Sequence, residues 1–233
     1  MLKINLEFLY NKRKDAPILR GRVYSVNFLL QPLLAYTVFQ NKTDKLTKLT
    51  FSTYFISFYL CTLICVVYHG SSCKVIDRSL YARIDYASIF VQIVTNFLPS
   101  FVYFIENDTH VILSMFHTLL NFAGAFVSLF MDFIETSRRF RVVVFWVGTT
   151  CTNFLLYSYL KNNMYVPASL FLLTYIVAVC AGLVYSSGKP NLIPGVFEFI
   201  ELSHLLYTIG SVTLFYAHAI SMGLIKHDLY YLT

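Results

Sequence analysis

The amino-acid sequence predicts an all-α protein, a seven-transmembrane helix bundle with a cytosolic N-terminus and an exoplasmic C-terminus. Of its 233 residues, 57% are hydrophobic and only 13% are charged, whereas soluble proteins carry about 25% charged residues. Cutting the chain at every Asp, Glu, Lys and Arg leaves seven long charge-free stretches, the shortest of which has 19 residues. A helix needs about 20 apolar residues to cross a bilayer, because its backbone polar groups must be satisfied within the segment. The stretches are residues 23–41, 49–73, 86–105, 109–131, 142–160, 162–188 and 202–225.

The distribution of Lys and Arg sets the predicted orientation. With a cytosolic N-terminus, the segments on the inner side hold 13 of these residues and the segments on the outer side hold five. Cytosolic loops of membrane proteins are enriched in Lys and Arg, so this orientation is favoured over its reverse. The same asymmetry accounts for the net charge of +6, and no nucleic-acid partner is expected.

We expect two parts, a basic cytosolic tail at residues 1–22 and a seven-helix transmembrane domain at residues 23–233. The tail mixes six Lys and Arg residues with polar groups and lacks the continuous apolar core of a cleavable signal peptide. A soluble helical protein would need solvated helix faces between the apolar stretches, and almost no residues remain to build them. The sequence therefore predicts an integral, multi-pass protein of the plasma membrane or an endomembrane.

Ionisable side chains gather near the cytosolic ends of three predicted spans. His69 ends the second span, Asp85 begins the third, and His204 lies near the start of the seventh. Ionisable groups at such depth usually face the bundle interior and have a partner or a function. Cys65 lies one helical turn before His69, so both can project from one face. Two imidazoles, a thiol and a carboxylate at one depth would suit zinc; the alternative is that each is a separate interfacial polar residue.

The remaining histidines and cysteines offer weaker candidates. His218 follows His204 by 14 residues, about 21 Å along a helix, so the two cannot share an ion. His110 and His117 enter from the outer side, and we expect interfacial or packing roles for both. Tyrosines near predicted span ends, Tyr24 among them, are typical of interfacial aromatic residues. The five cysteines are scattered, and their spacing predicts neither a disulfide framework nor a CxxC metal site.

Two segments carry a resemblance to a known family. The first contains Tyr68-His69, a short basic loop, the run Arg83-Ile-Asp85-Tyr-Ala-Ser-Ile89 and Pro99. The second is Lys189-Pro-Asn-Leu-Ile-Pro-Gly-Val-Phe-Glu-Phe-Ile-Glu-Leu-Ser-His204, followed by Gly210-Ser211. Together, in this order and at these helix ends, they resemble the progestin and adipoQ receptor (PAQR) family, with its bacterial haemolysin III relatives. The resemblance covers residues 20 to about 225.

The resemblance implies a zinc ion near the cytosolic face, held by one histidine at the end of the second helix and two on the seventh. By position, His69 and His204 match two ligands, and Asp85 matches an aspartate that attends the water at the metal. The chain departs from the family pattern at two positions, because Ile200 replaces the third histidine and Cys65 replaces a serine. A thiolate is a strong zinc ligand, so we expect Cys65 to substitute for the missing histidine.

The expected site residues are therefore Cys65, His69 and His204 as metal ligands and Asp85 as the catalytic residue, with Glu201 as a further group able to turn toward the metal. The resemblance points to zinc-dependent hydrolysis of a lipid amide, of the ceramidase type, in an enzyme or lipid-linked receptor. A membrane lipid or ceramide-like molecule is then the expected partner. The alternative is a non-catalytic lipid-binding receptor or scaffold whose metal site has decayed, as the missing histidine suggests. A pore is suggested only by the haemolysin name, and spans four to six offer few polar groups to line one.

Overall fold

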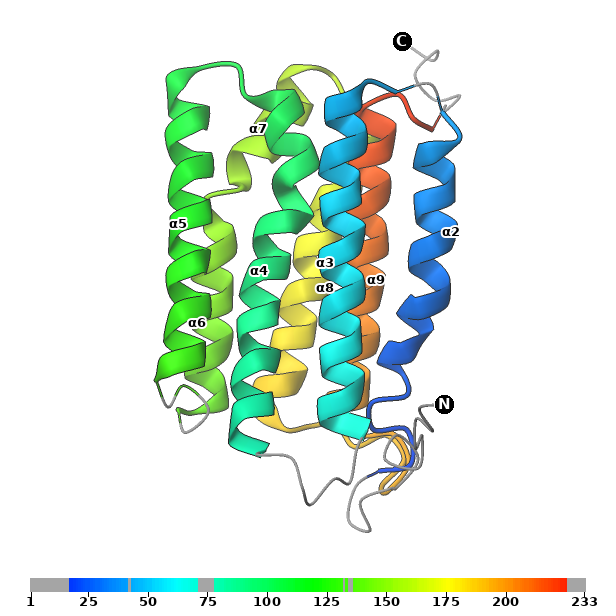
Figure 1. Cartoon of the computed structure of the whole chain (residues 1–233), viewed down its shortest axis with the longest axis vertical. Helices are drawn as coiled ribbons and strands as arrows, with labels where there is room; N and C mark the ends of the chain where they lie inside the picture. Colours follow the sequence, from blue (N-terminus) through cyan, green and yellow to red (C-terminus); the bar gives the residue numbers. More distant parts are fainter. Residues whose placement is uncertain (1–16, 42, 71–77, 132, 134–135, 226–233) are drawn as a thin grey trace, which may run out of the picture.

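The computed structural model describes residues 17–225 apart from 42, 71–77, 132 and 134–135. All regular secondary structure in these residues is helical, with one isolated antiparallel bridge between Ile193 and Phe197. The helices pack along a common axis (Figure 1), and the predicted all-α class is confirmed. The elements are the short 3-10 helix η1 (Tyr24–Val26) and the helices α2 (Asn27–Phe39), α3 (Lys45–Gly70), α4 (Arg78–Phe104), α5 (Asp108–Phe130), α6 (Arg138–Thr150), α7 (Asn153–Lys161), α8 (Tyr165–Ser187) and α9 (Phe199–Ser221).

Helices α2 to α9 form the predicted bundle of seven rods, because α6 and α7 follow one another in a single rod (Figure 1). Both α2 and α9 run beside the longer apolar helices. The helix α2 is short and is extended at its start by η1, and α9 carries polar residues that the bundle buries. Five helical segments among the described residues are long and apolar enough to cross a membrane, namely Lys45–Gly70, Ser79–Phe104, Asp108–Phe130, Arg138–Lys161 and Tyr165–Ser187.

The predicted fifth span, residues 142–160, is interrupted between α6 and α7. At the break, the backbone N–H of Thr152 donates to the carbonyl of Thr149 (3.0 Å), although Gly148 would be its partner in a continuous α-helix. The side chain of Asn121 on α5 donates instead to the Gly148 carbonyl (2.9 Å). Because an unpaired carbonyl is costly in hydrocarbon, this hydrogen bond makes the break tolerable within a membrane.

The third span begins earlier than predicted. The sequence placed its start at Asp85, but α4 already includes Arg78, so Asp85 lies about two turns inside the helix. Only 5% of the Asp85 surface is exposed. The expectation was wrong because the charge of Arg83 was taken to mark a loop, whereas long basic side chains near a helix end can extend to the membrane interface.

The core between α2, α3 and α9 is aromatic. Phe51, Tyr54 and Phe58 are fully buried on one face of α3 and belong to one cluster with Phe215 of α9. The rings of Phe51 and Phe215 meet edge to face with centroids 6.0 Å apart, an arrangement that aromatic pairs favour. This packing joins the first half of α3 to the second half of α9, so the two helices run side by side in opposite directions.

The end of α3, the start of α4 and the start of α9 therefore lie at the same end of the bundle (Figure 1). Helix α2 begins at this end and α9 finishes at the opposite end, as an odd number of crossings requires. Which end faces the cytosol remains a prediction from the charge distribution. Residues 1–16 of the predicted tail, and the predicted loop position of Cys73, lie outside the described residues.

Candidate metal centre

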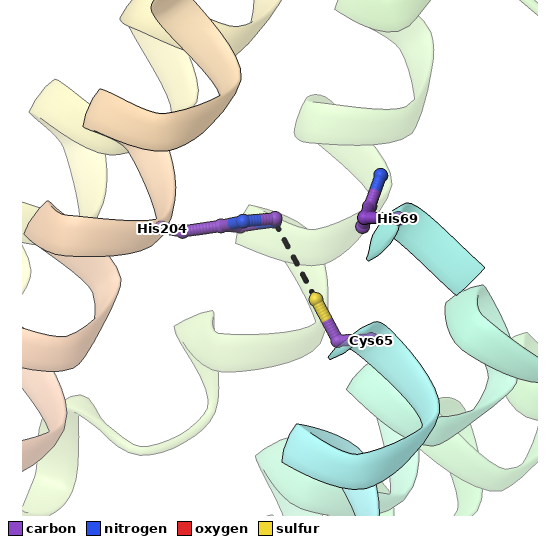
Figure 2. Close-up of side chains that lie close together, drawn as sticks. All are labelled: Cys65, His69 and His204. Carbon is purple, nitrogen blue, oxygen red and sulfur yellow. Dashed lines mark hydrogen bonds between the residues drawn. The ribbon is translucent and has the colours of Figure 1, made fainter. Parts of the chain in front are cut away.

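Three potential metal ligands meet where α3 ends and α9 begins. Cys65 and His69 lie one turn apart on α3, and His204 extends toward them from α9 (Figure 2). One ligand atom of each residue lies within 4.8 Å of the other two. The sulfur of Cys65 is 3.7 Å from Nε2 of His204, and the two imidazole rings have centroids 5.1 Å apart. These residues form a group that could hold a metal ion, and we call it the Cys-His-His group.

Asp85 approaches the Cys-His-His group from α4. Its Oδ2 lies 3.8 Å from Nε2 of His69, which is too long for a direct hydrogen bond but leaves room for a bridging water. One turn later on α4, the hydroxyl of Ser88 donates to the Asp85 carbonyl (2.7 Å) and to Sγ of Cys61 (3.3 Å). These contacts join α4 to α3 beside the group. The structure thus brings together the four residues that the sequence singled out.

Tyr24, which the sequence places at a span end, also belongs to this site. Only 3% of its surface is exposed, so its ring packs inside the protein. Its ring centroid lies 5.1 Å from that of His204 and 6.3 Å from that of Tyr207. Tyr24 therefore covers the imidazole of His204 from the side of η1 and limits the directions in which that ring can turn. Because tyrosines are common at span ends, the residue type alone could not reveal this position.

Arg20 is a second residue that the sequence did not indicate. Its guanidinium donates to the carboxylate of Glu201 and lies 3.7 Å from that of Glu198. The side chains of Arg20 and Glu201 are only 12% and 1% exposed. Since both acidic residues are in the first turn of α9 or at its cap, Arg20 holds the start of the helix that carries His204.

Backbone hydrogen bonds reinforce this attachment. The N–H of Ile18 donates to the carbonyl of Gly195 (2.9 Å), and the N–H of Leu19 donates to that of Val196 (3.1 Å). The segment 18–20 is thereby fastened to the residues that lead into α9. We call this set of contacts the N-terminal clamp. It fixes the direction in which α9 enters the bundle, a turn and a half before His204.

Glu201, which the sequence left able to turn toward the metal, does not turn toward the Cys-His-His group. Helix α9 starts with a capping box, in which the backbone N–H of Glu198 donates to Oε2 of Glu201 (2.9 Å). Its other carboxylate oxygen accepts from Arg20. Both oxygens are therefore used in starting the helix. Ile200, one turn before His204, offers no ligand atom. The potential ligand beside His204 is Cys65, whose sulfur lies 3.7 Å from Nε2 of His204.

Three further histidines in the described part of the chain lie in packing positions outside the group. His218 is fully buried in the second half of α9, where Nδ1 is 2.5 Å from the hydroxyl of Ser100 and Nε2 is 2.9 Å from the carbonyl of Asn96. His117 is also fully buried, and only 6% of the His110 surface is exposed. As predicted, His218 belongs to a separate set of contacts and cannot share an ion with the histidine at the start of its helix.

The apolar helices and the Cys-His-His group at one end of the bundle are those of a helical membrane protein with a candidate metal centre. The family model for haemolysin-III related proteins matches residues 19–215. The chain belongs to the haemolysin-III related family, and the resemblance drawn from its two segments is confirmed. A search of curated proteins found no match. Family membership and the apolar helices together identify an integral membrane protein.

Replacing Arg20 with Gln should destabilise the protein by about 3 kcal/mol, because it leaves the buried carboxylate of Glu201 without its counter-charge. Thermal unfolding of the purified protein in detergent micelles measures the effect. Arg22→Gln is the matched control, since Arg22 is exposed and surface substitutions usually change stability by less than about 0.5 kcal/mol. Equal unfolding temperatures for the two variants would show that the N-terminal clamp contributes no stability.

Proposed function

We propose that the protein is a zinc-dependent lipid amide hydrolase of the ceramidase type, acting in the cytosolic leaflet of the plasma membrane or an endomembrane. The observation that carries the proposal is the approach of Cys65, His69 and His204 to within 4.8 Å of one another, with Asp85 beside them. In this proposal the Cys-His-His group holds the metal, and Asp85 is the catalytic residue.

The donor atoms of the Cys-His-His group suit zinc. In a tetrahedral site with bonds of about 2.0 Å to nitrogen and about 2.3 Å to sulfur, those two ligand atoms lie about 3.5 Å apart. The 3.7 Å between Sγ of Cys65 and Nε2 of His204 is close to this separation. The other ligand atoms of the group lie up to 4.8 Å apart. Side-chain shifts of about 1 Å would bring them to the separations of a tetrahedral zinc site. Three protein ligands with an open fourth position are typical of catalytic rather than structural zinc.

The residues around the group suit hydrolysis of an amide. When bound, zinc would polarise the substrate carbonyl and activate a water molecule as the nucleophile. Asp85 lies 3.8 Å from the ligand His69, where its carboxylate can accept the proton that this water loses. The same carboxyl group can then return a proton to the amine as the C–N bond breaks. The products are a fatty acid and an amine that retains the rest of the lipid.

The position of the group favours a substrate that comes from the bilayer. Cys65 and Asp85 are each only 5% exposed, and the group lies where α3 ends and α9 begins, at one end of the bundle. A lipid head group and the first atoms of its chains lie at the depth of a helix end. With the orientation predicted by the positive-inside rule, this end faces the cytosolic leaflet.

Replacing Cys65 with Ala should lower the zinc affinity by at least about 100-fold. Removing a residue that only hydrogen-bonds to a metal ligand already lowers metal affinity by about 10–100-fold, and Cys65 is proposed to bind the metal directly. Cys61→Ala is the matched control, since Cys61 is buried one turn earlier on α3 but is not in the Cys-His-His group. Elemental analysis of protein dialysed against a weak chelator gives the zinc content. Full zinc occupancy in the Cys65 variant would refute its role as a ligand.

Replacing Asp85 with Asn should reduce fatty acid release from ceramide by about 10²–10⁴-fold, because a proton acceptor is lost, while the zinc content stays unchanged. Release is measured with purified protein in mixed micelles of detergent and ceramide. Asp44→Asn is the control, since its carboxylate is exposed and lies just before α3, at the far end from the group. The proposed function is abandoned if the wild-type protein carries no metal and releases no fatty acid from ceramide or related lipids.

A second candidate function is favoured by Ile200, which stands where the resemblance implies a histidine. In this case the protein is a non-catalytic lipid-binding receptor or scaffold whose metal site has decayed. Ile200→His distinguishes the two functions, because a decayed site would regain zinc and activity. We expect no gain in either, since Cys65 already lies 3.7 Å from Nε2 of His204. Zinc content and fatty acid release of the variant beside the wild type provide the comparison.

A further inference from the structure

A groove between α6 and α8 lies outside the Cys-His-His group and is formed by other helices. Its volume is about 620 Å³. Its walls are mostly apolar and include Val143, Trp146 and Leu183; Val143 and Leu183 are 51% and 55% exposed. Two cationic residues, Arg139 in the first turn of α6 and Lys189 just after α8, complete the lining. The groove therefore joins an apolar surface to a basic end.

The floor of this groove is set by a close approach of the two helices. A Cβ atom at Gly182 of α8 would lie 2.8 Å from Val142 and 2.9 Å from Trp146 of α6. Real Cβ atoms do not approach carbon atoms this closely, because packed atoms prefer about 3.5–4.0 Å. The absence of a side chain at Gly182 thus allows Trp146 to lie across α8 and form part of the wall.

Three arginines occur at the start of α6, and two of them contact other parts of the protein. The guanidinium of Arg138 lies 4.7 Å above the ring of Phe199, at the start of α9. Arg141 is buried and donates to the hydroxyl of Tyr185 (3.2 Å). Arg139 differs from both, because it is exposed and lines the groove.

Arg139 and Lys189 form no ion pair within the part of the chain that the structure describes. Both are exposed at the end of the bundle that also carries the Cys-His-His group. Two cations at the end of an apolar groove favour a ligand with an anionic head and an apolar tail. Basic pockets between membrane helices on the cytosolic side bind anionic lipid head groups.

We infer that this groove binds an anionic phospholipid, with its phosphate between Arg139 and Lys189 and an acyl chain along Val143, Trp146 and Leu183. A soluble anion would gain nothing from the apolar walls. A lipid without net charge would gain little from the two cations, because its ammonium group offsets its phosphate. The inference is independent of the proposed hydrolysis, since none of these residues belongs to the Cys-His-His group.

Trp146 is the only tryptophan in the chain, so its fluorescence reports on the groove alone. The test uses wild-type protein in phosphatidylcholine vesicles that contain a minor fraction of either brominated phosphatidylglycerol or brominated phosphatidylcholine, whose bromine atoms quench tryptophan. We expect the brominated anionic lipid to occupy the groove at least about tenfold more readily than the brominated neutral lipid, because each basic residue near the membrane surface favours an anionic lipid. Equal quenching by the two lipids would overturn the inference.

Two double variants sharpen this test. Arg139→Gln with Lys189→Gln should abolish the preference for brominated phosphatidylglycerol. Arg22→Gln with Lys45→Gln removes the same charge from exposed positions outside the groove and should keep the preference. Circular dichroism confirms that both variants are folded. Retention of the preference in the first variant, or its loss in the second, would refute the assignment to this groove. Relief of quenching by inorganic phosphate would instead assign the basic end to a free anion and overturn the lipid as ligand.

Discussion

Polar side chains on α9 must find partners inside the bundle, because a hydrocarbon environment offers none, and the positions of the other helices follow from those partners. One stripe of α9 pairs in turn with the segment before η1, with α3, with α2 and with α4. Arg20 donates to Glu201, and Sγ of Cys65 lies 3.7 Å from Nε2 of His204. The amide of Asn27 donates to Thr208 (3.1 Å), and the hydroxyl of Ser100 pairs with His218. The stripe consists of Glu201, His204, Thr208, Ser211 and His218. The last helix is therefore the one around which the protein is built.

The sequence was sufficient for the fold class and for the residues that meet in the Cys-His-His group. Charge-free stretches locate membrane helices, because lipid excludes charges over a fixed thickness. Connectivity then places the end of α3 and the start of α9 at one level. The spacing of Cys65 and His69 adds a shared face. No further information was needed to predict that His204 lies at their depth.

The sequence could not reveal contacts that depend on distant segments. Arg20 and Glu201 are 181 residues apart, and nothing in either local pattern indicates the other. Tyr24 looks like an ordinary interfacial tyrosine until the packing of η1 on α9 is known. The start of α4 was misplaced for a different reason, since a charged side chain near a helix end does not end the helix. The break between α6 and α7 depends on Asn121 of α5, which is distant in sequence as well.

Placing two candidate ligands on α3 and one on α9 differs from the pattern that the resemblance implies, in which the last helix supplies two. The relative position of Cys65 and His69 is set by the backbone of a single helix. Only the distance to His204 depends on how α3 and α9 pack. Tyr24, whose ring centroid lies 5.1 Å from that of His204, is the aromatic residue that packs directly against the ligand from α9.

The N-terminal clamp has a consequence for biosynthesis. Chains are made from the N-terminus, and their parts generally fold in that order, so Arg20 leaves the ribosome long before Glu201. The guanidinium then has no access to its buried partner until the last helix has been translated and inserted. Joining the segment before η1 to α9 is therefore among the final events of maturation. A nascent chain that stalls before α9 would hold six rods but could not close the bundle.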